Sequence, residues 1–202
     1  MGNNRELYGI WKWVFFTMVT LSIILTINQL FNLHLFGLTV ITNSYLYFLL
    51  ATFLSGAFLF YPINKNIKSK KIPWYDLTLF FISIRIVLYM GFNGMKITLE
   101  AWEFNAPDIA IIPAVILWIL IIEGVRRVSG NILAFIVTIF SIYPIISPFL
   151  PGFLEGQGSS LFQTAAFHVF GTQSIIGIPI NIFGNLIIGF IIFGVVMGAT
   201  GA

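Results

Sequence analysis

Long apolar stretches dominate the chain, and short segments between them carry most of its charged residues. No Asp, Glu, Lys or Arg occurs between Lys12 and Lys65, and Glu155 is the only charged residue after Arg127. Residues 109–122 show none of the polar–apolar alternation that a membrane-barrel strand requires. A helix of about 20 apolar residues crosses a bilayer core and satisfies its own backbone. The pattern therefore predicts an all-α polytopic membrane protein.

The same pattern predicts about six transmembrane helices, with a short interfacial helix before the last one. Ser160 and Gln163 have the spacing of a capping box, which predicts that the short helix begins there. Apolar residues recur along one face of the ten residues that follow, as in a helix at a membrane interface. The six predicted spans are residues 13–31, 44–61, 74–92, 108–126, 131–147 and 180–200.

Composition excludes the soluble classes of protein. The 202 residues are 58% hydrophobic and 8% charged, whereas soluble domains carry about 25% charged residues. Such a chain cannot cover a water-facing surface, so it is not a soluble enzyme, a nucleic-acid binder or a disordered tail. It contains no cysteine, which excludes disulfides, thiolate metal sites and cysteine nucleophiles.

The placement of the basic residues predicts the orientation. If the spans alternate, eight of the ten basic residues lie on one side of the membrane, and Lys96 alone lies on the other. Basic loop residues stay in the cytoplasm. We therefore expect a multi-pass protein of the bacterial inner membrane with a cytoplasmic N-terminus and an uncleaved first span. The eight residues are Arg5, Lys12, Lys65, Lys68, Lys70, Lys71, Arg126 and Arg127.

Arg85 is a basic residue inside a predicted span. It follows Trp74 by eleven residues, which places it about 16 Å from the cytoplasmic end of a helix. An arginine at that depth costs at least about 2.5 kcal/mol, so it should face protein or water. Glu123 on the next span is the nearest acidic candidate, although it lies nearer the cytoplasm. An interhelical contact is favoured, and contact with a substrate or partner is the alternative.

Two further groups of polar residues are candidates for helix contacts. Glu123 precedes Arg126 and Arg127 at helical spacing, which predicts intrahelical ion pairs; a role between subunits is the alternative. Asn181 and Asn185 share a face of the last span, where they either form hydrogen bonds across helices or mark a polar path.

The sequence offers no set of residues for catalysis or metal binding. His34 and His168 lie far apart, and no cluster of acidic residues accompanies either one. Asp76 and Asp108 lie at span ends, whereas an intramembrane aspartyl protease needs two embedded aspartates. No glycine-rich phosphate loop occurs. We therefore predict no catalytic residues, no metal site and no bound cofactor.

Several segments, taken in order, resemble the fused permeases of tripartite ATP-independent periplasmic (TRAP) transporters, in the TAXI branch. The similarity covers nearly the whole chain. The segments are residues 45–62 with the basic linker and Trp-Tyr-Asp at 74–76, Glu-Gly-Val-Arg-Arg at 123–127, Tyr-Pro-Ile-Ile-Ser-Pro-Phe-Leu-Pro-Gly at 143–152, and residues 167–179 and 193–201.

The resemblance implies two domains and a transport function. Residues 1–127 would form a four-helix scaffold similar to the small permease, and residues 128–202 would be the truncated beginning of the large permease domain. The family imports carboxylate-type solutes, with sodium as the coupling ion. The implied partners are the lipid bilayer, a periplasmic solute-binding protein and the remainder of the large permease domain.

The chain departs from this family in two ways. The hairpins that form the family's sodium and substrate sites would follow residue 202, so no such site residue is carried over. Arg85 stands where the family leads us to expect an apolar residue. We therefore expect a scaffold that cannot transport alone. The alternative is a non-transporting membrane assembly or regulatory subunit.

Overall fold

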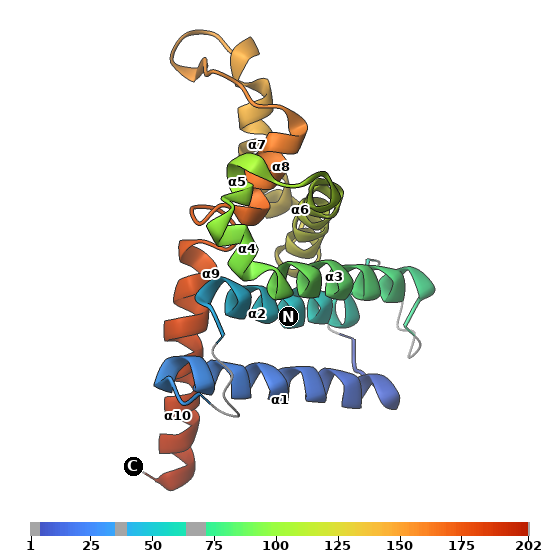
Figure 1. Ribbon diagram of the computed structural model, residues 1–202. Coiled ribbons are helices and arrows are strands. Elements are labelled where there is room, and N and C mark those ends of the chain that lie inside the picture. Colours follow the sequence, from blue (N-terminus) through green and yellow to red (C-terminus); the bar gives the residue numbers. More distant parts are fainter. Residues whose placement is uncertain (1–4, 35–39, 64–71, 202) are drawn as a thin grey trace.

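The computed structural model describes residues 5–34, 40–63 and 72–201, and every regular element in these ranges is helical (Figure 1). Six helical segments are long and apolar enough to cross a membrane, which confirms the predicted all-α polytopic fold. Lys65, Lys68, Lys70 and Lys71 lie outside the described residues. The six segments are α1 (Ile10–Phe31), α2 (Thr42–Phe60), α3 (Trp74–Phe92), α6 (Asp108–Ser129), α7 with the following turn (Asn131–Phe149), and Ile178–Thr200.

The last segment contains three elements, and shorter helices lie between the long ones. Ile178–Thr200 comprises α9 (Ile178–Ile182), a π-helical turn η4 (Phe183–Ile187) and α10 (Ile188–Thr200). The shorter elements are α4 (Gly94–Leu99), α5 (Trp102–Asn105), the 3-10 turns η2 (Ser147–Phe149) and η3 (Gly152–Leu154), and α8 (Leu161–Phe170).

Proline and glycine set several of the helix boundaries. Pro73 and Pro107 stand immediately before α3 and α6 with extended backbone angles, where the missing N–H costs no helical hydrogen bond. Gly130 separates α6 from α7 with a φ of 94°, a conformation that glycine adopts without a Cβ clash.

α2 is the central helix of the molecule. It packs most extensively on α3, and it also contacts α1, α4 and α6. Within its membrane-length window 61% of the residues are buried, compared with 17% for α1. Figure 1 shows α1, α2 and α3 stacked side by side, whereas α10 runs across this stack and α7 projects away from it. The six long helices therefore do not form one simple up-and-down bundle.

α8 begins at the predicted capping box and packs one face against the neighbouring helices. The Gln163 N–H donates to Ser160 Oγ (3.2 Å), and the Ser160 N–H donates to Gln163 Oε1 (3.0 Å). Val169 is buried, and its carbonyl accepts a hydrogen bond from the Tyr47 hydroxyl of α2 (2.8 Å). The apolar face of α8 lies against α5, α6 and α7. One face of this short helix is thus buried, whereas Leu161, Phe162 and Phe167 on the other face are exposed.

Candidate functional site

A buried ionic network joins the N-terminal segment, α3 and α6. Asp76, in the first turn of α3, is fully buried. Its Oδ2 accepts from Arg5 Nη2 at 2.7 Å, and its Oδ1 accepts from Arg127 Nη1 at 2.8 Å. The side chain of Arg127 is also fully buried. One carboxylate thus holds arginines from two separate parts of the chain.

The same network reaches the end of α2 through backbone carbonyls. Arg5 donates to the Leu59 carbonyl through Nη1 (3.2 Å) and to the Phe60 carbonyl through its backbone N–H (2.8 Å). Arg127 Nη1 donates to the Tyr61 carbonyl at 3.1 Å. These bonds satisfy carbonyls at a helix C-terminus that have no partner within the helix.

Glu123 completes the network through the two arginines of its own helix. Arg126 donates to both carboxylate oxygens of Glu123 (2.6 and 2.7 Å), and Arg127 Nε donates to Oε1 at 2.8 Å. The predicted pairing at helical spacing is therefore confirmed. Arg5, Arg126 and Arg127 also lie at the same end of the structure, as the alternating spans require.

A small hollow borders this network. It has a volume of about 260 Å³, and its lining includes both Arg126 and Arg127. Three arginines and two carboxylates leave the network with one excess positive charge. Within the described ranges, Arg127 Nη2 is buried and has no hydrogen-bond partner. The remaining lining residues are Pro62, Ile63, Gly130 and Asn131.

Arg85 does not join this network. Its side chain is exposed on α3, and no hydrogen bond or ion pair links it to any other described residue. The expectation that it contacts Glu123 is wrong, because both Glu123 oxygens are occupied by Arg126 and Arg127. The interhelical role expected of Arg85 is performed instead by Asp76.

Asn181 and Asn185 bond to each other along their own helix. Asn185 Nδ2 donates to Asn181 Oδ1 at 2.9 Å, which confirms that they share a face. The interhelical bond of this region comes from the π-helical turn between them. There the Gly184 carbonyl accepts from the Tyr45 hydroxyl at 2.8 Å, and the same hydroxyl lies 3.2 Å from Thr26 Oγ1. Tyr45 thus links α1, α2 and η4.

A second polar cluster lies between α6, α7 and α8. His168 Nε2 lies 2.9 Å from the Ser141 carbonyl oxygen, and its Nδ1 lies 2.9 Å from Ser174 Oγ. A carbonyl only accepts, so Nε2 donates to Ser141, and in the neutral ring Nδ1 then accepts from the Ser174 hydroxyl. Trp118 Nε1 donates to Ser141 Oγ at 2.9 Å, and its ring lies 5.4 Å from that of His168. These four side chains border a cavity of about 390 Å³ whose other lining residues are aliphatic or aromatic.

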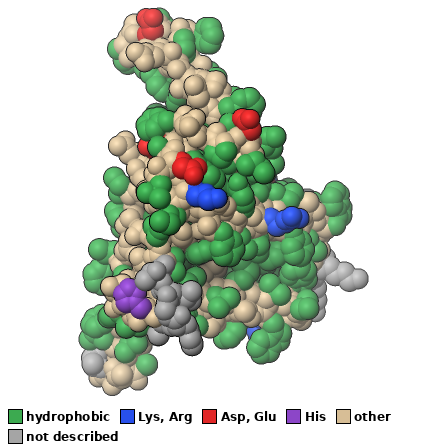
Figure 2. Space-filling model, viewed as in Figure 1, with side chains coloured by type: hydrophobic (Ala, Val, Ile, Leu, Met, Phe, Trp, Pro, Cys, Tyr) green, Lys and Arg blue, Asp and Glu red, His purple; other side chains and the backbone are tan. Residues whose placement is uncertain are grey.

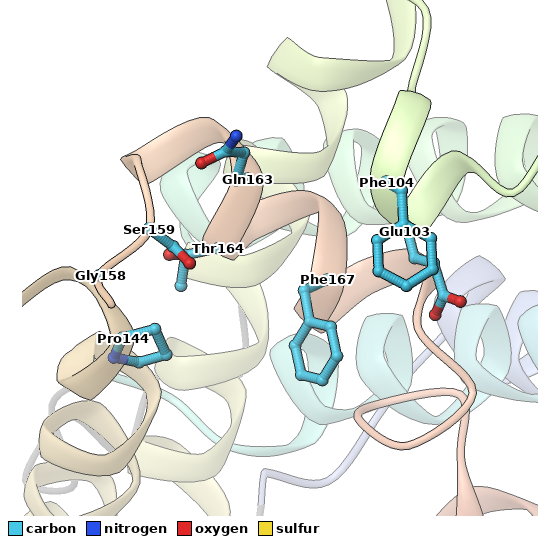
Figure 3. A pocket seen from close by; sticks show the side chains of 8 residues that line it. All are labelled: Glu103, Phe104, Pro144, Gly158, Ser159, Gln163, Thr164 and Phe167. Atoms are coloured by element: carbon cyan, nitrogen blue, oxygen red, sulfur yellow. The ribbon is translucent and has the colours of Figure 1, made fainter. Parts of the chain in front are cut away.

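A larger cavity of about 460 Å³ lies on another side of α8, and Figure 3 shows the side chains that line it. Glu103 supplies its one charged group, and the hydroxyl of the buried Thr164 has no hydrogen-bond partner among the described residues. The cavity is lined by Glu103, Phe104, Pro144, Gly158, Ser159, Gln163, Thr164 and Phe167.

In the described part of the chain, no three His, Asp or Glu side chains are placed to hold a metal ion.

Comparisons with protein-family models, with curated proteins and with solved structures give no match. The resemblance to TRAP permeases therefore rests on the sequence segments quoted above. The division at residue 127 also stays a prediction.

The sequence did not reveal the two residues that anchor the network. The sequence identifies Asp76 as an acid at a span end and as part of the Trp-Tyr-Asp segment, and Arg5 as one of several basic residues near the first span, without indicating that they pair. A usable signal was present for Asp76, because it lies in the first turn after Pro73, where a carboxylate is close to the end of a neighbouring antiparallel helix. In the structure, the neighbouring helix is α6, and Arg127 near its C-terminal end donates to Asp76.

Proposed function

We propose that this chain is the scaffold part of a TRAP-type permease in the bacterial inner membrane. The complete transporter would import carboxylate-type solutes that a periplasmic binding protein delivers, with sodium as the coupling ion. In this proposal the N-terminus and the Asp76 network face the cytoplasm. The ordered sequence resemblance supports the family, and the positive-inside bias supports the orientation.

The buried network is the observation that carries the scaffold role. Asp76 and Arg127 have no side-chain exposure, and they connect α3 and α6 with the end of α2 and the segment before α1. Charged groups on a solute path need access to water and exchangeable partners. Here the carboxylates are occupied by arginines of the same chain, which is typical of a rigid support.

The exposed helices are consistent with a scaffold that has neighbours in the membrane. Only 11% of the residues in the Asn131–Phe149 window and 6% of those in Ile178–Thr200 are buried. Figure 2 shows a face composed mainly of hydrophobic side chains, with few charged ones. Such surfaces are compatible with lipid and with further apolar helices.

Reconstituted transport tests this proposal. The permease containing these 202 residues would be placed in proteoliposomes with its cognate binding protein and a panel of radiolabelled carboxylates. We expect uptake that requires both the binding protein and an inward sodium gradient. The 202-residue chain alone should give none.

Either of two results contradicts the proposal. One is uptake by the 202-residue chain alone, which would place a solute path within it. The other is the absence of binding-protein-dependent uptake across the whole panel, although the permease is folded and inserted. The second result would favour the assembly or regulatory role.

A further inference from the structure

Arg85 is a charged residue in the middle of an apolar helix, and none of the described residues forms a hydrogen bond or ion pair with it. It follows Trp74 by eleven residues and precedes Phe92 by seven, so it lies about 16 Å and about 10 Å from the two ends of α3. One end is fixed by the Asp76 network and the other by the polar turn at Asn93. The side chain is nevertheless exposed on the outer face of the described structure.

Its surroundings on that face are apolar. The residues three and four positions before it are Ile82 and Phe81, which are 37% and 54% exposed, and those three and four positions after it are Leu88 and Tyr89. Arg85 is the only basic residue of α3. Neither α3 nor α2 places a carboxylate near it: Asp76 is bonded to Arg5 and Arg127, and α2 contains no acidic residue.

Lipid headgroups do not provide a ready partner. Side chains on a helix lean toward its N-terminus, and for Arg85 this is the more distant end of α3. A guanidinium exposed to hydrocarbon is costly, and arginines in spans therefore pair with other groups inside the membrane. The planar guanidinium is suited to a carboxylate, which it binds through two parallel hydrogen bonds.

A second copy of this chain does not supply that carboxylate. Its acidic residues lie outside the long helices or near their ends, and Asp76 and Glu123 are already paired. The seven acidic residues of the sequence are Glu6, Asp76, Glu100, Glu103, Asp108, Glu123 and Glu155.

We propose that the exposed face of α3 around Arg85 docks a partner transmembrane helix that carries an aspartate or glutamate at the same depth. The partner helix lies outside the 202-residue sequence, covers Ile82 and Phe81, and pairs its carboxylate with the guanidinium. This proposal does not depend on which solute, if any, the assembly transports.

Photocrosslinking in native membranes tests the proposal. A benzophenone amino acid would replace Ile82 on the same face, with Ile119 on α6, 59% exposed, as the control position. We expect an adduct at Ile82 whose partner peptide, identified by mass spectrometry, contains an acidic residue within an apolar stretch. Arg85→Leu should reduce that adduct at least 10-fold, whereas Arg85→Lys retains it. Any adduct at Ile119 should not respond to either substitution.

A charge exchange provides the second measurement. Arg85→Glu should abolish the adduct, and replacing the partner's acidic residue with arginine in the same cells should restore it. Three results would overturn the proposal: adducts with lipid or with a second copy only, a partner segment without an acidic residue, or an adduct unchanged by Arg85→Leu. Equal amounts of membrane-inserted protein in all variants separate loss of docking from loss of folding.

Discussion

α2 and the segment Ile178–Thr200 are both membrane-length helices, yet 61% of one and 6% of the other is buried. The buried helix is the less hydropathic of the two. It carries Tyr45, Tyr47 and Ser55, which form hydrogen bonds with α1, η4, α8 or the backbone of their own helix. Lipid is as apolar as leucine, so helices associate through polar groups and close packing. Of these two segments, the more buried one is therefore the one whose polar side chains bond to its neighbours.

The largest expected effect comes from breaking the network at the end of this buried core. Asp76→Asn removes the charge that neutralises Arg5 and Arg127, and it should destabilise the protein by about 3–5 kcal/mol. Thermal unfolding of the purified protein in detergent measures the loss. Asp108→Asn, at an exposed position in the first turn of α6, is the matched control and should leave the melting temperature nearly unchanged. Equal shifts for both would show that the network does not hold the helices together.

Two glycines of the last segment should respond with opposite signs. A Cβ at Gly184 would lie 2.7 Å from Leu49 Cδ1 and 3.1 Å from the Tyr45 hydroxyl, so Gly184→Ala should cost about 1–3 kcal/mol through overpacking. A Cβ at Gly194 meets no atom within 4 Å, so Gly194→Ala should stabilise α10 by up to about 1 kcal/mol. Chemical denaturation of the two variants checks the signs. Stabilisation by Gly184→Ala would refute the close contact with α2.

A smaller effect is expected at the Trp118 cluster. Trp118→Phe removes the indole N–H that binds Ser141 Oγ and should cost about 1 kcal/mol. Ser141→Ala tests the same bond from the other side, and the double variant should show coupling between the two positions. Strictly additive losses in the denaturation midpoints would mean that the bond contributes nothing.

The smallest expected effect is at Arg85 in the isolated chain. Its side chain is exposed and makes no hydrogen bond or ion pair with another described residue, so Arg85→Leu should change the unfolding free energy by less than about 0.5 kcal/mol. The measurement is the same detergent melt used for Asp76→Asn. A loss comparable to that of Asp76→Asn would indicate a partner for Arg85 within the chain.

The contrast also explains how far the sequence could predict this structure. Six long helices follow from uninterrupted apolar stretches, and the start of α8 follows from Ser160 and Gln163, because these signals are local. The bond between Asp76 and Arg127 joins residues 51 positions apart, and no local pattern specifies which arginine meets which acid. In the sequence Glu123 is the nearest acidic candidate for Arg85, although it lies nearer the cytoplasm, but Arg126 and Arg127 occupy that carboxylate.

The packing arrangement of the helices is harder to predict from the sequence than the helices themselves. An apolar helix gives no sequence sign of which neighbour it crosses, because every side of it tolerates lipid. The crossing of the last segment over the stack of α1–α3 depends on a few contacts, such as the Tyr45–Gly184 bond. Such contacts are visible only once the chain is folded.

Cysteine accessibility along α3 tests the central claim, that this helix crosses the membrane with the Asp76 end in the cytoplasm. The chain has no cysteine, so Trp74→Cys, Ile82→Cys and Phe92→Cys each introduce a single thiol at an exposed position. With a membrane-impermeant maleimide, we predict labelling of Phe92→Cys in intact spheroplasts, of Trp74→Cys only after the inner membrane is opened, and of Ile82→Cys only after denaturation. Labelling of Ile82→Cys before denaturation, or of both ends from the same side, would contradict the account.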